Sequence, residues 1–382
     1  MNATNKQRRQ SGCANRAWCR LNRLWLRVAA FLLLGAGVSP AAEQPKPASQ
    51  PARFPLTEEQ VMGPQFLDHV REAFEQWSLE SYDPKTGGFL GGIRTKDTSD
   101  VIWIRYACNA ADLGAPDRKQ IVAFLDERLD SDLWMATRAI RILGGEPTRV
   151  SKKYFDKSAG IDLTTPAAYR KFAEASKGDP IHSYLPLIAS GGKEYVDIMY
   201  DVLGKRMLED GTFGGFRPDF KATVFYSATG RLPPHPEKIL ARYLPSGDGP
   251  LTAGYIGGDG FEAMDKFYLI VRLSIGLGPE VADKVRARYR AGLNQSRRAF
   301  LALQKNPGHF KTGGIHLFLA AIHGLGLLQE MLPDELPSQR PYRFGWEMAD
   351  HYNCAVIRAA IAEHAESPPA DGKKGETHEN AK

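Results

Sequence analysis

Short loops of glycine and aromatic residues recur along this chain of 382 residues, and they limit its fold more than any other feature. They occupy residues 87–92, 211–216, 257–261 and 307–310. In most cases the segment after the loop is more apolar than the segment before it. Glycine allows the positive φ angles and close backbone approach that a sharp turn between helices requires. The recurrence therefore predicts a fold built from repeated helical hairpins.

The segments between the loops are of two helical kinds. Residues 58–79 and 280–300 carry an apolar stripe opposite a charged face, which is typical of helices that bury one side. Residues 264–277 and 315–328 are apolar nearly all round, which indicates helices covered on both sides. We interpret this alternation as an all-α fold, an (α/α) toroid of about six helical hairpins with inner and outer rings. A stacked solenoid of helical pairs is the alternative.

The expected organisation has four parts. Residues 1–41 form a signal peptide, residues 42–55 a flexible linker rich in proline and alanine, residues 56–365 the toroid domain, and residues 366–382 a polar, disordered tail. Within the domain, residues 216–260 are rich in proline and glycine. We expect them to form a long loop over one mouth of the ring.

The amino terminus has the pattern of an export signal. Residues 1–41 contain seven Lys and Arg and no acids, followed within them by an apolar run at 28–38 and small residues Ser39 and Ala41. Eleven apolar residues are too few to span a bilayer. We expect a periplasmic or secreted protein with no membrane span in the mature chain, and a retained anchor is the alternative. Without this segment 43 cations face 44 acids, so charge gives no basis for binding nucleic acid.

Two cysteines, Cys108 and Cys354, remain once the signal is removed. Two separate buried thiols are the usual state of free cysteine. One disulfide is the alternative in an oxidising compartment. A zinc role for Cys354 with His351 is disfavoured, because structural zinc takes four nitrogen or sulfur ligands at readable spacings. We therefore expect no cofactor.

The loops and the segments beside them resemble the repeat of the terpenoid cyclases and protein prenyltransferases. In that repeat a Gln-Asn-Pro-Asp-Gly-Gly-Phe run joins an outer helix to an inner one. Residues 301–310 are similar to it, residues 83–89 and 208–215 match its core, and residues 267–273 are similar to its inner helix. The resemblance implies an α/α toroid with a cavity for an apolar or isoprenoid-like ligand. The Asp-x-Asp-Asp acid of the cyclases and the Asp-x-Cys zinc pair of the prenyltransferases are absent from the sequence, so the family's reactions are not implied.

Acidic residues follow the loops, where a toroid would place them round its central cavity. Asp97 and Asp100 follow the first loop, and Asp265 follows the third. Several carboxylates round one apolar cavity could work as a general acid and a general base. The alternative for Asp97 and Asp100 is helix capping, which Asp commonly performs. Asp265 lies a turn inside an apolar segment, where capping does not explain it.

A second polar cluster, Asp350, His351 and Tyr352, opens the last apolar segment. His is the commonest general base, and Tyr can polarise a substrate. The alternative is a helix cap followed by ordinary packing. His316 and His323 lie seven residues apart on one face of an expected inner helix. They could line the cavity, although core histidines are more frequent at such positions.

Three functions fit these features. The leading hypothesis is a protein that binds or acts on an apolar or isoprenoid-like ligand in a central cavity. The first alternative is a carbohydrate-active toroid, a polysaccharide lyase or glycoside hydrolase, with His351, Tyr352 and an inner carboxylate as acid and base. The second is a non-catalytic binding or scaffold protein. A cavity lined by apolar groups would favour the first function, and a groove lined by Arg, Lys and Trp would favour sugar polymers.

Overall fold

Helices make up nearly all of the regular structure. The computed structural model describes residues 52–131, 133–149, 165–175, 193–253, 260–344 and 359. These residues contain thirteen α-helices and one short hairpin, which confirms the all-α class. The helices are α2 (Glu58–Met62), α3 (Phe66–Glu80), α4 (Thr95–Ala107), α5 (Arg118–Glu127), α6 (Leu133–Ile142), α7 (Pro166–Ala175), α9 (Lys193–Arg206), α10 (Phe216–Ala228), α11 (Pro236–Tyr243), α12 (Gly260–Gly276), α13 (Pro279–Ala291), α14 (Leu293–Leu303) and α15 (Ile315–Met331).

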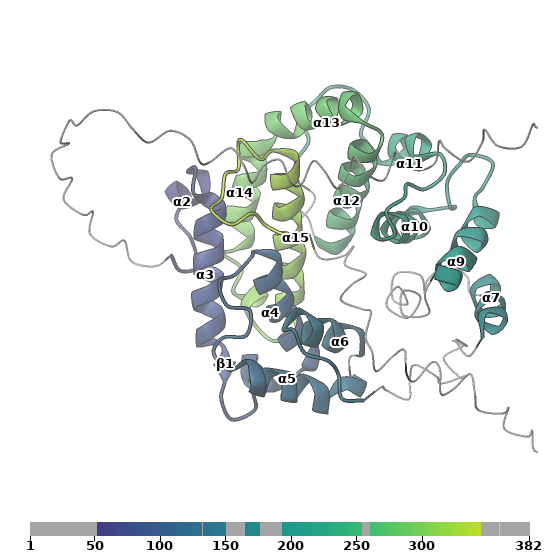
Figure 1. Cartoon of the computed structure of the whole chain (residues 1–382). Coiled ribbons are helices and arrows are strands. Elements are labelled where there is room, and N and C mark those ends of the chain that lie inside the picture. Colours follow the sequence, from purple (N-terminus) through teal and green to yellow (C-terminus); the bar gives the residue numbers. More distant parts are fainter. Residues whose placement is uncertain are drawn as a thin grey trace, which may run out of the picture. The chain divides into compact units, whose positions relative to one another are not determined.

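Four helices, α4, α10, α12 and α15, are buried on most sides. They are next to one another in a series: α4 packs against α6 and α15, α15 also packs against α12, and α12 packs against α10 (Figure 1). This confirms that residues 264–277 and 315–328 form helices covered on both sides, because α12 and α15 include nearly all of them. Burial of both faces accounts for the lack of a polar stripe in these segments.

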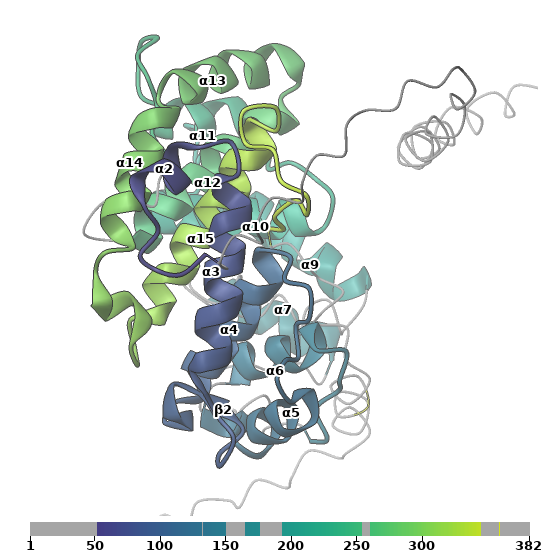
Figure 2. The same ribbon diagram turned by 90° about the vertical axis from the view of Figure 1, so that its left-hand side faces the viewer.

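Other helices bury one face only. In α3, Phe66, Val70 and Phe74 point into the core, and in α13, Val285 and Tyr289 do so. The helices α2, α3 and α14 lie side by side, on the face of the molecule that is turned toward the viewer in Figure 2. The one-sided burial expected from the charged faces of these segments is therefore confirmed.

Both segments expected to be single amphipathic helices are broken. The first divides at Gly63-Pro64 into α2 and α3, because proline cannot donate the hydrogen bond that would continue a helix. The second divides at Gly292 into α13 and α14. A Cβ atom on Gly292 would collide with the backbone of Leu251, so only glycine allows this close approach.

The first glycine loop is a small hairpin closed onto the helix that follows it. Strands β1 (Tyr82–Asp83) and β2 (Gly88–Phe89) pair antiparallel, and the 3₁₀ turn η1 (Leu90–Gly92) leads toward α4. The Phe89 N–H donates to Thr98 Oγ1 of α4 over 3.1 Å. The second loop repeats this device, since the Phe213 N–H donates to Asp219 Oδ1 of α10 over 2.6 Å. The two loops thus share a structural role, in support of the repeat.

The expectation of one long loop at residues 216–260 is wrong, because about half of that range forms α10 and α11. Two of its prolines lie at the starts of these helices. Pro218 lies in the first turn of α10, and Pro236 is the first residue of α11. Proline is tolerated there because the first amides of a helix have no partner within the helix.

Ala52 and Phe54, which we assigned to the linker, pack against the core. Phe54 lies against Phe310 and Phe318, with ring centroids 4.9 and 5.4 Å away. Leu56 exchanges two hydrogen bonds with the Gln304 amide, of 2.8 and 3.0 Å. The expected signal peptide and tail lie outside the described residues. Within the described part of the chain, no helix has the length and apolar character needed to cross a bilayer.

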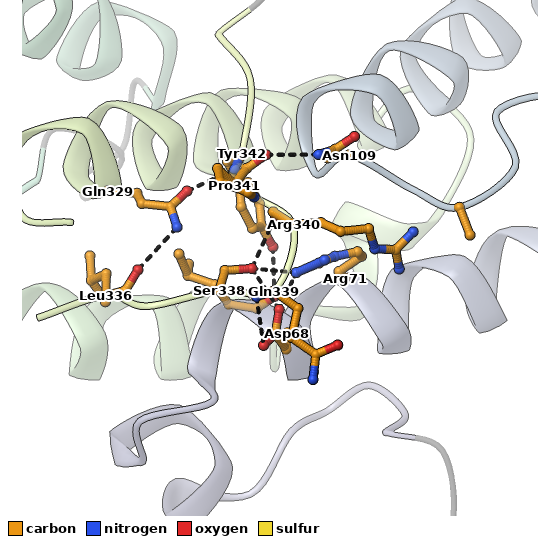
Figure 3. Close-up of polar contacts among 12 residues, drawn as sticks. Asp68, Arg71, Asn109, Gln329, Leu336, Ser338, Gln339, Arg340, Pro341 and Tyr342 are labelled. Carbon is orange, nitrogen blue, oxygen red and sulfur yellow. Dashed lines mark hydrogen bonds and ion pairs between the residues drawn. The ribbon is translucent and has the colours of Figure 1, made fainter. Parts of the chain in front are cut away.

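The chain after α15 is fastened to α3 and α15 by a polar network (Figure 3). Ser338 Oγ donates to Asp68 Oδ1 over 2.6 Å, and the Tyr342 hydroxyl donates to the Leu67 carbonyl over 3.0 Å. The Tyr342 N–H donates to Gln329 Oε1 over 2.7 Å. These bonds fix the path of the chain immediately before Phe344.

Phe344 completes a group of aromatic rings between α4, α12 and α15. Its ring centroid lies 5.0 Å from that of Tyr268 and 5.2 Å from that of His323. His323 also meets Trp103 edge to face at 4.9 Å. Trp103, His323 and Tyr268 are buried. The apolar surfaces of these helices are thus covered by one another at this level.

Candidate active site

An aspartate–histidine pair joins two neighbouring buried helices. Asp100 is the sixth residue of α4, and His316 is the second residue of α15. His316 Nδ1 lies 3.1 Å from each carboxylate oxygen of Asp100. Asp100 is fully buried, whereas 29% of the His316 side chain is exposed. The carboxylate therefore lies behind a ring that solvent reaches.

This geometry suits proton transfer. A carboxylate on one ring nitrogen fixes the orientation and tautomer of an imidazole, and it stabilises the charged ring after a proton is taken up. Because Nδ1 faces Asp100, Nε2 is the nitrogen left to exchange a proton with a bound molecule. The pair can therefore provide one oriented general base or general acid.

Burial dominates the electrostatics of Asp100. Removal from water raises the pKa of this carboxyl above its ordinary value of 3.8, because the charged form loses its hydration. The hydrogen bond and charge of His316, and the charge of Lys96, act in the opposite direction, and Asp97 adds to the increase. The ionised form of Asp100 thus depends on cations from α4 and α15.

A third helix contributes an aromatic ring to the pair. Phe261, in the first turn of α12, stacks on the His316 ring with centroids 4.1 Å apart and planes inclined by 23°. The His316 ring is therefore held on one edge by Asp100 and on one face by Phe261. The amino-terminal ends of α4, α12 and α15 meet at this point, so the site is built on helices and not on a loop.

Asp97 acts on the turn before α15 and not as a helix cap. Its carboxylate accepts the Gly313 N–H, with both oxygens within 3.3 Å, and it lies 4.0 Å from Arg94 Nη1. The residue that precedes α4 is Arg94, and no side chain caps that helix. The capping interpretation of Asp97 and Asp100 is therefore wrong. Asp97 is buried and positions the segment that carries His316.

Asp265, the third carboxylate expected at the site, belongs to a separate ion pair. Its Oδ2 atom lies 3.0 Å from Arg217 Nη1 of α10, and its side chain is buried. The charge of Asp265 also favours the protonated form of Lys221, whose pKa burial lowers. The hypothesis of one cluster of three carboxylates is therefore replaced by an Asp–His pair on α4 and α15 and an Asp–Arg pair on α12 and α10.

The carboxyl-terminal candidates Asp350, His351 and Tyr352 lie outside the described residues, and so does Cys354 with its suggested zinc role. Cys108 is a free thiol that is fully buried, and burial raises its pKa to about 12. Among the residues that the structure describes, no three His, Cys, Asp or Glu side chains are grouped to hold a metal ion.

The sequence contained a signal for the partner of Asp100. His316 follows the fourth glycine loop and Gly313-Gly314, much as Asp97 and Asp100 follow the first loop. The rule that polar residues after these loops face one region therefore groups His316, which we named as a possible cavity residue, with the aspartates. His323, about two turns further along the same face of this helix, is instead a core residue.

Comparison with known proteins adds no assignment, because no family model, no curated protein and no solved structure matches this chain. The geometry of the described residues therefore carries the functional argument.

Proposed function

We propose that this chain is an exported α/α-toroid enzyme in which His316, held by Asp100, moves a proton to or from a polar substrate. The observation that carries the proposal is the contact of 3.1 Å between these two side chains. A buried carboxylate behind a partly exposed imidazole is an arrangement that general acid–base catalysis uses.

The proposed architecture is a toroid of about six helical hairpins. The burial of α4, α10, α12 and α15 on most sides supports an inner ring, and the one-sided burial of α3 and α13 supports an outer one. In such a ring the inner helices run parallel, so their amino-terminal ends meet on one side. The meeting of Asp100, His316 and Phe261 agrees with this arrangement.

We further propose that the substrate is a carbohydrate and the enzyme a polysaccharide lyase or glycoside hydrolase. The His316 ring is partly open to solvent and has the Asp100 carboxylate of α4 behind it, so a polar substrate could reach it. In a lyase His316 would take the proton from the carbon next to a carboxylate. In a hydrolase it would take the proton from the attacking water.

The apolar or isoprenoid-like ligand implied by the resemblance stays a prediction. Trp103, Tyr268 and His323 are buried against one another and against Phe344. Their rings thus already fill part of the space in which such a ligand would lie, and this favours the polar substrate. A non-catalytic binding protein would not need a proton-transfer pair that solvent reaches.

The test is a substrate screen with the mature chain. Neutral and uronate-containing polysaccharides are incubated with the wild type, and new reducing ends and ultraviolet-absorbing unsaturated ends are measured. His316→Gln should lower the rate by about 100-fold or more, the range that one general base contributes. The control is His235→Gln, an exposed histidine beside Glu237. Full activity of His316→Gln, or cleavage of no polymer by the wild type, would contradict the proposal.

A further inference from the structure

A pocket of about 810 Å³ opens beside the start of α4. Its walls come from the segment that leads into α4 and from the end of α5 with the 3₁₀ turn η2 (Leu129–Ser131). The lining residues are Ile93, Arg94, Thr95, Lys96, Arg128, Asp130 and Ser131. Three of these seven side chains are cationic, so the pocket is suited to a negatively charged group.

Arg128, one of the three cations, is held in place by contacts with uncharged groups. Arg128 Nη1 donates to the Gly92 carbonyl over 2.6 Å, and its guanidinium lies 4.3 Å from the centre of the Phe124 ring. A hydroxyl hydrogen bond of 2.6 Å between Thr95 and Ser131 joins the two walls. A ligand would therefore meet a guanidinium that is already placed, which lowers the entropy lost on binding.

The acidic residues near the pocket do not cancel the positive charge of its three cations. Asp130 is the acid in the lining, and its Oδ2 atom lies 2.6 Å from Arg149 Nη1, outside the lining. Asp97 lies 4.0 Å from Arg94 and also accepts the Gly313 N–H. No side chain caps α4, so the partial positive charge of its amino terminus adds to the field of the cations.

Two cations of the pocket also act near the Asp100–His316 pair, which does not itself line the pocket. Lys96 lines the pocket, and its charge acts on the carboxyl of Asp100 one turn further along α4. Arg94 borders the turn before His316, since a Cβ atom on Gly313 would lie 2.7 Å from Arg94 Nη1. Lys96 and Arg94 thus link the pocket to α4 and to the turn that carries His316.

We propose that this pocket binds the oxyanion of an acidic sugar, a carboxylate or a phosphate, and so presents the neighbouring part of the sugar to His316. Arg94, Lys96 and Arg128 are the binding residues. Arginine and lysine are the usual partners of both anions, because their hydrogen bonds to a charged acceptor are stronger than neutral ones. This inference rests on the proposed function and specifies its substrate as an anionic carbohydrate.

Calorimetric titration of the mature chain tests the proposal with three probes: sodium glucuronate, glucose 6-phosphate and glucose. Binding of either anion, weakened by salt and without comparable binding of glucose, is the expected result. The better anion identifies carboxylate or phosphate as the natural group. Equal binding of glucose, or no binding of either anion, would overturn the inference.

Variants locate the binding to the pocket. The double variant Arg94→Gln with Lys96→Gln should weaken anion binding by about tenfold or more, because it removes two of the three cations that would hydrogen-bond the anion. Lys284→Gln, an exposed lysine on α13, is the control and should bind as the wild type does. Unchanged affinity in the double variant would contradict the assignment.

One further variant separates this inference from the proposed function. His316→Gln should bind glucuronate or glucose 6-phosphate as tightly as the wild type does, because His316 does not line the pocket. Anion binding with normal turnover in His316→Gln would refute the catalytic role alone. Loss of turnover in His316→Gln, with no anion binding by the wild type, would refute the pocket alone.

Discussion

His316 and Asp100 are 216 residues apart in the sequence and 3.1 Å apart in the structure. Their contact joins α15 to α4, and a buried carboxylate thereby meets a ring that solvent reaches. Because Asp100 has no exposed surface, its charge depends on His316 and Lys96. The stability of the protein should therefore report on the ionisation of Asp100.

The substitution Asp100→Asn removes that ionisation. In the folded protein the pKa of Asp100 is raised above its ordinary 3.8, mainly by burial, so the folded state holds the proton more tightly than the unfolded state does. The resulting stabilisation is present at low pH and is lost as pH rises from about 3.8 through the raised pKa. The unfolding free energy of the wild type minus that of Asp100→Asn should fall over this window, by at most about 1.4 kcal/mol per pH unit. Urea titrations between about pH 4 and pH 7 measure this, and a difference that rises with pH would contradict it.

His323 should make stability fall in acid. Burial, with the charges of Arg138 and His316, lowers its pKa well below 6.5, so the folded protein keeps it neutral while the unfolded chain takes up a proton. Stability is therefore lost as pH falls below about 6.5. Between pH 7.5 and pH 5.5 the wild type should lose about 1.4 kcal/mol more than His323→Phe, a variant that keeps a ring beside Trp103 and does not titrate. Equal losses in the two proteins would show that His323 takes up a proton in the folded protein as readily as in the unfolded chain, against this expectation.

Two buried tyrosines offer a matched test of the network in Figure 3. The Tyr342 hydroxyl donates to the Leu67 carbonyl over 3.0 Å. The Tyr169 hydroxyl is buried without a hydrogen-bond partner in the described part of the chain. Tyr342→Phe should lower the unfolding free energy by about 1 kcal/mol, because it removes a buried hydrogen bond. Tyr169→Phe should be neutral or stabilising, and denaturant titration of both variants gives the comparison. The account fails if Tyr169→Phe costs more than Tyr342→Phe.

The thiol of Cys108 should be free and unreactive. It is fully buried, and burial raises its pKa to about 12, so almost no reactive thiolate forms near neutral pH. Iodoacetamide should label Cys108 only after unfolding, and without any reductant. Peptide mass spectrometry distinguishes this from a disulfide with Cys354, which would block labelling until a reductant is added.

The apolar pattern of the sequence was enough to predict the two kinds of helix. A helix buried on one side has an apolar stripe, as α3 and α13 do, and a helix buried on most sides is apolar nearly all round, as α12 and α15 are. Breaks and starts were harder to predict. Gly292 interrupts its segment because the backbone of Leu251 approaches it, a contact between residues distant in sequence. From the sequence alone, Pro218 and Pro236 are equally compatible with a loop and with the start of a helix.

The site was predicted only in part for the same reason. Asp100 was selected from its place after a glycine loop, but the sequence does not state which helix lies beside α4. His316 becomes its partner only because α15 packs there. Asp97 and Asp265 were selected by the same rule, yet Gly313 and Arg217 are the groups that they bind. Spacing along the chain can select polar residues that follow the loops. It cannot predict which of them pair, because the pairing depends on which helices pack together.

The most direct test of the central claim is a double-mutant cycle on kcat with the polymer that the wild type cleaves. Asp100→Asn, His316→Gln and the double variant are compared at saturating substrate. If Asp100 acts by holding His316, the double variant should be no slower than His316→Gln alone, because groups that act as a unit are not additive. Independent losses that multiply in the double variant, or a kcat of His316→Gln equal to that of the wild type, would contradict the account.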